Sequence, residues 1–93
     1  MGTSNYEKLT DEQLIRNLRD GDKKIMDYIM EKYKNVVRKE AKAMYLIGGE
    51  NDDLIQEGMI GLFKAVRDYD TAQDVSFGSF DRLCIRSQMY RAA

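Results

Sequence analysis

Three carboxylates, those of Asp52, Asp53 and Glu57, fall within about one helical turn and are the side chains of this chain best placed to do chemistry. Oxygen ligands of this kind bind divalent cations, or they pair with basic groups on a partner. The chain has no histidine, so the usual general base and the commonest metal ligand are missing. A metal-dependent enzyme that also uses Asp68 and Asp70 is therefore the least favoured alternative. We expect no metal, no cofactor and no catalysis.

The segment over residues 53–70, DLIQEGMIGLFKAVRDYD, predicts an amphipathic helix at about 100° per residue. One side is expected to be buried and holds Leu54, Ile55, Gly58, Met59, Leu62, Ala65 and Val66. The opposite side is polar except for one isoleucine and holds Asp53, Gln56, Glu57, Ile60, Lys64 and Arg67. An aliphatic side chain in the middle of a polar surface predicts contact with a partner molecule.

Two features of this helix work against its local stability. Asp53 and Glu57 are like charges at i,i+4, which destabilises an isolated helix by about 0.2–0.5 kcal/mol. Favourable interaction of acidic residues with the helix dipole is the alternative explanation for them. Gly58 and Gly61 each cost about 1 kcal/mol relative to alanine, and close packing of a neighbouring helix is the simpler explanation for both.

Length and composition indicate one small soluble domain of the all-α class. The chain has 93 residues, no proline and no alternating strand pattern, while good helix formers are abundant. No apolar run approaches the roughly 18 residues of a membrane span, and no signal peptide is visible. The single cysteine, Cys84, excludes an internal disulfide. We therefore expect a compact bundle of about four helices with no membrane partner.

The helix boundaries follow from capping residues and glycines. Residues 1–8 are expected to be a disordered or artificially added N-terminus, followed by one domain over residues 9–93. Thr10 and Gln13 form a capping-box pattern that begins a short helix, which ends at Gly21. Further helices are predicted over residues 23–46, 51–69 and 79–93, with Gly48-Gly49 and a polar loop over residues 70–78 between them. Their expected N-caps are Asp22, Asn51 or Asp52, and Ser79. The last helix is unfinished at Ala93, so we expect a piece truncated from a longer protein.

Basic residues gather in two places although the net charge is −1. Residues 23–42 and residues 80–93 are both rich in lysine or arginine, so basic patches coexist with an acidic total. One face of the last helix gathers Phe80, Leu83, Cys84, Ser87, Tyr90 and Arg91. Together with Phe77 this face predicts a stacking platform beside a phosphate contact. Packing of the apolar members against another helix, with solvated arginines, is the alternative.

Three collinear blocks resemble region 2 of bacterial RNA polymerase sigma factors, from Leu9 onward. They are LIRNLRDGDKKIMDYIMEKYKNVVRKEAKAMY, DLIQEGMIGLFKAVRDYD and FGSFDRLCIRSQMYRAA. Among subfamilies, YLIGGENDDLIQEGMIGLFKAVRDYD most resembles the sigma-H type associated with stationary phase, sporulation and competence. The resemblance implies a cytoplasmic alternative sigma factor domain with the compact helical fold of that family.

The resemblance assigns two surfaces. The family's contacts with the clamp-helix coiled coil of the polymerase β′ subunit carry over to Asp53, Gln56, Glu57, Met59, Ile60 and Phe63. Its contacts with the non-template strand of the promoter −10 element carry over to Phe77, Phe80, Arg82, Leu83, Cys84, Arg86, Ser87, Tyr90 and Arg91. Leu83 and Cys84 stand where primary sigma factors have tandem tryptophans, which implies a weaker melting wedge. Lysines of the second helix would add phosphate contacts.

The expected function is therefore docking on core RNA polymerase and recognition and melting of the −10 element during transcription initiation. An anti-sigma factor is a further implied partner. The alternative is a helical regulatory adaptor that binds only protein through Ile60 and has no DNA role.

Overall fold

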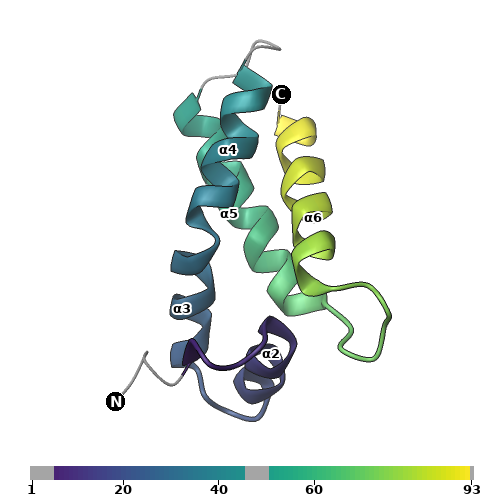
Figure 1. Ribbon diagram of the computed structural model, residues 1–93. Helices are drawn as coiled ribbons and strands as arrows, with labels where there is room; N and C mark the ends of the chain where they lie inside the picture. Colours follow the sequence, from purple (N-terminus) through teal and green to yellow (C-terminus); the bar gives the residue numbers. More distant parts are fainter. Residues whose placement is uncertain (1–5, 46–50, 93) are drawn as a thin grey trace.

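The structure, a computed structural model, describes residues 6–45 and 51–92. Within these two ranges the chain forms helices and connecting loops and no strand, which confirms the all-α class (Figure 1). The helices are α2 (Asp11–Arg19), α3 (Lys24–Lys32), α4 (Lys34–Tyr45), α5 (Asn51–Asp68) and α6 (Phe77–Ala92). The helices α4, α5 and α6 lie side by side, while α2 lies across the lower end of the molecule (Figure 1).

The first predicted helix is confirmed at both ends. The Thr10 hydroxyl accepts a hydrogen bond from the Gln13 backbone N–H at 3.1 Å, and the Gln13 side chain accepts one from the Thr10 backbone N–H at 2.9 Å. These bonds satisfy two donors that the first turn of a helix leaves free. At the other end, Gly21 has a φ of +121°, a value that residues other than glycine rarely adopt.

The side chains of Tyr6 and Asp22, near the N-terminus, are hydrogen-bonded to each other. Asp22 does not cap the next helix, because its carboxylate accepts a hydrogen bond from the Tyr6 hydroxyl at 2.9 Å, and Lys23 stands at the cap position. The Tyr6 ring packs edge-on against Tyr28, with ring centroids 5.3 Å apart. Tyr6 thus contacts the domain through both its hydroxyl and its ring.

The predicted second helix is two helices, because the chain bends at Tyr33. Its backbone φ and ψ of −95° and 3° lie outside the helical range, yet the hydrogen bonds Tyr33 N to Ile29 O and Val37 N to Tyr33 O continue on both sides. The Tyr33 side chain contacts residues far away in the sequence: its hydroxyl is hydrogen-bonded to Asp11, and its ring packs edge-on against Phe77. The bend comes from these long-range contacts, so the local periodicity does not reveal it. Three further predictions lie outside the described residues: the end of this helix at Leu46, the break at Gly48-Gly49 and a cap from the Asn51 side chain. Asp52, the alternative cap, lies inside α5.

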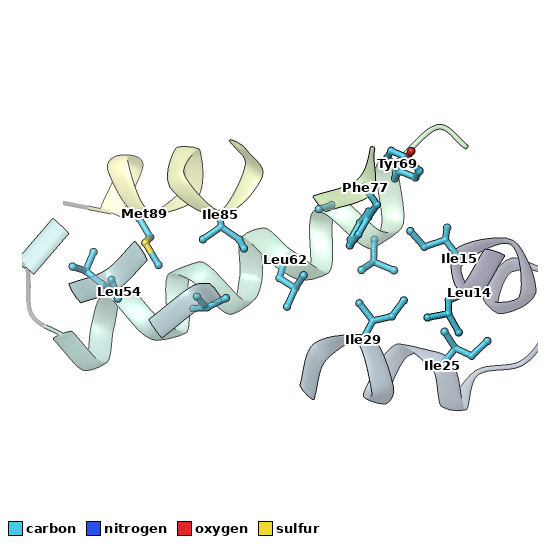
Figure 2. Close-up of a cluster of buried hydrophobic side chains, with 14 of the residues drawn as sticks. Leu14, Ile15, Ile25, Ile29, Leu54, Leu62, Tyr69, Phe77, Ile85 and Met89 are labelled. Atoms are coloured by element: carbon cyan, nitrogen blue, oxygen red, sulfur yellow. The ribbon is translucent and has the colours of Figure 1, made fainter. Parts of the chain in front are cut away.

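The core runs the length of the bundle (Figure 2). At one end Leu54 of α5 lies near Ile85 and Met89 of α6, and Leu62 connects this group to an aromatic and aliphatic cluster at the other end. The buried hydrophobic residues are Leu14, Ile15, Ile25, Ile29, Val37, Ala41, Met44, Leu54, Leu62, Ala65, Val66, Tyr69, Phe77, Ile85 and Met89. The predicted apolar side of residues 53–70 is confirmed, with Ile55 and Met59 only half-buried at its edges.

The helix α2 secures both ends of the loop between α5 and α6. The Arg19 guanidinium donates to the backbone carbonyls of Val66, Arg67 and Tyr69, which are acceptors that the end of α5 leaves free. The Glu12 carboxylate accepts the backbone N–H of Phe77 at 2.9 Å, at the positive end of α6. One short helix thus sets where α5 stops and where α6 starts.

Two glycines let α6 approach α5 closely. A Cβ atom added to Gly61 would lie 2.7 Å from the Cys84 backbone oxygen and 2.9 Å from the Ile85 Cα. A Cβ added to Gly58 would overlap the Met89 and Val37 side chains. The packing explanation of both glycines is therefore confirmed.

Gly61→Ala is expected to lower the free energy of unfolding by about 1–3 kcal/mol, because the clash is with backbone that has to move. This loss exceeds the roughly 1 kcal/mol gain in helix propensity. Urea unfolding followed by circular dichroism measures the change. A Gly61→Ala chain as stable as the native one would contradict the close approach of α6.

Candidate functional site

The outward side of α5 presents an apolar pair in a polar surrounding. Ile60 and Phe63 are 44% and 45% exposed and lie one turn apart on the helix. Asp53 and Gln56 are exposed on the same helix one to two turns earlier, and Met59 is half-buried beside Ile60. We call the set Asp53, Gln56, Glu57, Met59, Ile60 and Phe63 the α5 face. Its exposed apolar centre and polar rim are the arrangement of a small protein-binding surface.

Glu57 is engaged within the chain, which sequence reasoning did not foresee. It is half-buried, and its Oε1 accepts a hydrogen bond from Gln88 Nε2 at 2.8 Å. The Gln88 Oε1 in turn accepts from Lys64 Nζ at 3.0 Å. Gln88 was not among the predicted site residues, and a helical projection of α6 alone gives no sign that it faces α5. The like charges of Asp53 and Glu57 are thus partly offset, because Glu57 has a donor from another helix.

A groove runs along the seam of α5 and α6. Its volume is about 430 Å³, and it is lined by Lys64, Arg67 and Asp68 from α5 and by Leu83, Cys84, Ser87, Gln88 and Arg91 from α6. Leu83 is 64% exposed, and Tyr90, one turn beyond Ser87 on α6, is 61% exposed. Three cationic side chains line the groove against one carboxylate, Asp68, whose pKa is lowered by its hydrogen bond from Arg67. The groove is therefore basic, with apolar side chains at its edge.

Four of the nine predicted DNA-binding residues line the groove, namely Leu83, Cys84, Ser87 and Arg91. Tyr90 lies on the same stretch of α6 but does not line the groove. Burial raises the pKa of the Cys84 thiol, so the groove holds it in its neutral form. A thiol of that kind packs as a small side chain and is a poor nucleophile.

The prediction of Phe77 as a surface aromatic was wrong. The helix α6 begins at Phe77 and not at Ser79, because the Ser76 hydroxyl accepts the Ser79 N–H and Glu12 accepts the Phe77 N–H. This earlier start turns Phe77 inward, where it is fully buried between Tyr33 and Tyr69. Aromatic type alone could not distinguish this core position from a stacking position.

Phe80 is half-buried, with its ring 5.5 Å from that of Tyr69, so only part of it is available to a ligand. Arg82 and Arg86 lie on the side of α6 that faces α4, and both pair with Glu40. The Arg86 Nε lies 2.7 Å from the Glu40 carboxylate, and this hydrogen bond raises the pKa of Arg86. Arg82, Arg86 and Glu40 together carry one net positive charge, whereas the sequence prediction counted two free positive charges for phosphate contacts.

Asp81 is an unusual residue of α6. Its side chain is fully buried, and neither carboxylate oxygen has a hydrogen-bond partner among the described residues. Burial raises the pKa of Asp81 to about 7, and the nearby Asp11 and Glu40 add to this effect while Arg82 opposes it. A neutral carboxyl is far less costly to bury than an ionised one, so protonation of Asp81 favours the folded state.

Across residues 6–45 and 51–92, His, Cys, Asp and Glu side chains do not gather in any group of three that could hold a metal ion. Within the same ranges each helix is too short or too polar to cross a membrane.

Together these features are a helical domain with an exposed apolar pair in a polar surrounding on α5 and a basic groove at the seam of α5 and α6. Residues 29–93 match the family model described as Sigma-70 region 2. The chain therefore belongs to the Sigma-70 region 2 family. Sigma factors are transcription initiation factors without enzymatic activity of their own.

The relatives are also sigma factors. The chain is 44% identical to the RNA polymerase sigma-H factor of Bacillus subtilis over 85 residues, which is 91% of this chain and 39% of that protein. Its identity to the sigma-H factor of Bacillus licheniformis is also 44%, over 91% of this chain and 38% of the relative. The sigma-F factor of Bacillus licheniformis is 38% identical over 73% of this chain and 27% of its own length. The chain thus spans about two fifths of the length of the sigma-H factors it matches.

Proposed function

We propose that this chain is the part of an alternative sigma factor that docks on core RNA polymerase and recognises and melts the promoter −10 element. The observation that carries the proposal is the exposed pair Ile60 and Phe63 inside a polar rim on α5. The docking partner is the clamp-helix coiled coil of the β′ subunit, as the family resemblance implies. The resemblance to the sigma-H type implies a role in stationary phase or sporulation, in the cytoplasm, with an anti-sigma factor as a further partner.

The α5 face supports docking through a small apolar contact with polar edges. Burial of Ile60 and Phe63 against a partner removes apolar surface from water, which is worth about 25 cal/mol per Å² before the costs of association. Asp53 and Gln56 at the rim offer an acidic and an amide group to basic and polar residues of the partner. Rim charges of this kind guide association more than they add to affinity.

The groove and its edge support binding of the non-template strand. Tyr90 and Leu83 offer exposed apolar surface for stacking, while Lys64, Arg67 and Arg91 offer charge to phosphates. Leu83 and Cys84 give less stacking area than the tryptophans of primary sigma factors, so we propose that the chain melts a narrower set of promoters. Lys64 and Arg67 are added to the predicted site by this geometry.

Binding of fluorescently labelled native chain to purified core RNA polymerase tests the proposal. Saturable binding that an unlabelled chain displaces supports it. A natively folded chain, verified by circular dichroism, that fails to bind core polymerase overturns it and favours the protein-binding adaptor.

Tyr90→Ala is expected to weaken binding of a single-stranded −10 oligonucleotide by about 5- to 150-fold, equivalent to the roughly 1–3 kcal/mol of one base–aromatic stack. Tyr90 is 61% exposed, so its removal leaves the core intact. Fluorescence anisotropy with the labelled oligonucleotide measures the change. Val75→Ala removes an exposed apolar side chain from the loop away from the groove and is the matched control. Equal affinities for native chain and Tyr90→Ala would place the strand elsewhere.

A further inference from the structure

The carboxylate of Glu40 joins α4 to two arginines of α6, the helix that lies beside it (Figure 1). The Arg86 Nε donates to Glu40 Oε1 at 2.7 Å, and Nη2 of the same guanidinium donates to Oε2 at 3.4 Å. The Arg82 Nε lies 3.8 Å from the same Oε2. Arg86 therefore presents a charge-assisted fork to Glu40, and Arg82 adds a looser ion pair.

The two arginines are open to solvent, whereas the carboxylate that they share is half-buried. The side chains of Arg82 and Arg86 are 56% and 50% exposed, and that of Glu40 is 14% exposed. Ion pairs of exposed arginines add little to the stability of a fold, since the charges are well hydrated when they are apart. The pairing therefore matters more for the charge of this surface than for the stability of the chain.

Glu40 interrupts a surface that is otherwise basic. Within α4 it is the one carboxylate among four cationic residues. Three of these, Arg38, Lys39 and Lys42, are exposed and line a shallow groove of about 300 Å³ together with Asn35. Without Glu40, the exposed charged side chains of α4 and of the adjoining side of α6 would all be cationic.

We infer that Glu40 is a positioning residue that withholds Arg82 and Arg86 from phosphate groups and thereby keeps sequence-independent binding of nucleic acid weak. Phosphate contacts hold a nucleic acid in place without reading its sequence, and each one adds to affinity whatever the sequence is. A phosphate has to displace the Glu40 carboxylate from the same guanidinium donors, so each such contact is offset by the loss of an ion pair. A larger share of binding then falls to the groove at the seam of α5 and α6. This inference rests on the proposed nucleic-acid binding.

Glu40→Gln tests the inference, because glutamine keeps the length of the side chain and loses its charge. The probe is a fluorescently labelled duplex of scrambled sequence, since phosphate contacts need no promoter. At about 50 mM salt the variant is expected to bind this duplex about 3- to 10-fold more tightly than the native chain. The slope of log affinity against log salt concentration is expected to become steeper by about 1 to 2, as one or two added phosphate contacts require. Fluorescence anisotropy measures both quantities.

Two controls separate this role from a general effect of charge and from a structural role. Asp27→Asn makes the same change of net charge on the exposed side of α3 and is expected to keep the native salt slope. Arg86→Ala is expected to leave duplex binding nearly unchanged in the native chain, where Arg86 is already paired, but to remove most of the gain in the Glu40→Gln chain. A pairing that serves only the fold would not produce this difference.

Three results overturn the inference: an unchanged salt slope in folded Glu40→Gln, an equal gain in Asp27→Asn, or an equal loss on Arg86→Ala in both backgrounds. Each leaves the proposed function standing while the native chain binds core polymerase and the single-stranded −10 oligonucleotide. Circular dichroism verifies folding. If Glu40→Gln does not fold, Arg86→Ala in the native chain decides, because a slope less steep by about 1 would show that Arg86 already contacts phosphate.

A wider failure has a different signature. Native and Glu40→Gln chains that are folded but bind neither the duplex nor the −10 oligonucleotide at low salt overturn both the inference and the proposed nucleic-acid binding.

Discussion

Ile60→Glu is expected to weaken binding to core RNA polymerase by about 30- to 1000-fold, the range of a central interface residue worth about 2–4 kcal/mol. The substitution removes the apolar centre of the α5 face and puts an uncompensated carboxylate into the contact. Ile60 is 44% exposed and lies outside the buried core, so the fold is expected to persist. A titration of labelled chain with core polymerase, compared with the native affinity, measures the loss.

Val75→Glu is the matched control for this experiment. Val75 is 45% exposed, carries the same kind of aliphatic side chain and lies in the loop between α5 and α6, away from the α5 face. The control is expected to bind core polymerase as the native chain does. Native affinity in Ile60→Glu would show that docking uses another surface.

Asp81→Ala is expected to make the chain more stable than the native protein at about pH 8, and to remove much of the loss of stability that the native protein shows between about pH 4 and pH 8. The pKa of Asp81 is raised from 3.8 to about 7 by its burial. The folded state therefore holds a proton that the unfolded state releases, and stability is lost as the pH rises through this window. At about 1.4 kcal/mol per pH unit the loss has an upper limit of about 4 kcal/mol, and we expect about 2–4 kcal/mol.

Charged groups around Asp81 add to the effect of burial on its pKa or oppose it. Asp11 from α2 and Glu40 from α4 disfavour its charge, the Tyr33 hydroxyl lies near without bonding to it, and Arg82 on α6 favours its charge only in part. Urea unfolding at about pH 4 and about pH 8 measures the difference. Asp27→Ala, on the exposed side of α3, is the control and is expected to keep the native pH profile. An unchanged slope in Asp81→Ala would contradict a buried, neutral carboxyl.

Local signals predicted the fold well where one helix decides the outcome. The capping box of Thr10 and Gln13, the turn at Gly21 and the buried side of residues 53–70 are all confirmed, because each depends on spacing within a few residues. The bend at Tyr33 and the start of α6 at Phe77 were missed, because contacts with α2 set both of them.

The candidate site divides in the same way. The amphipathic pattern of α5 was enough to find exposed Ile60, and the resemblance added Phe63. The pattern of α6 was ambiguous, because a stacking surface and a packing surface use the same residue types. Phe77 is buried in the core, and Arg82 and Arg86 pair with Glu40. All three are nevertheless residue types typical of a nucleic-acid interface.

The sequence by itself determined the helical class, the apolar and polar sides of α5 and the family to which the chain belongs. These properties follow from residue type and short spacing, and they hold in any arrangement of the helices. The tertiary structure alone decided which charges are paired, which aromatic residues are buried and that Gln88 joins the two candidate surfaces. Those outcomes depend on how closely α6 approaches α5 and where α2 lies against both, and such distances are set by the packing of residues far apart in the chain.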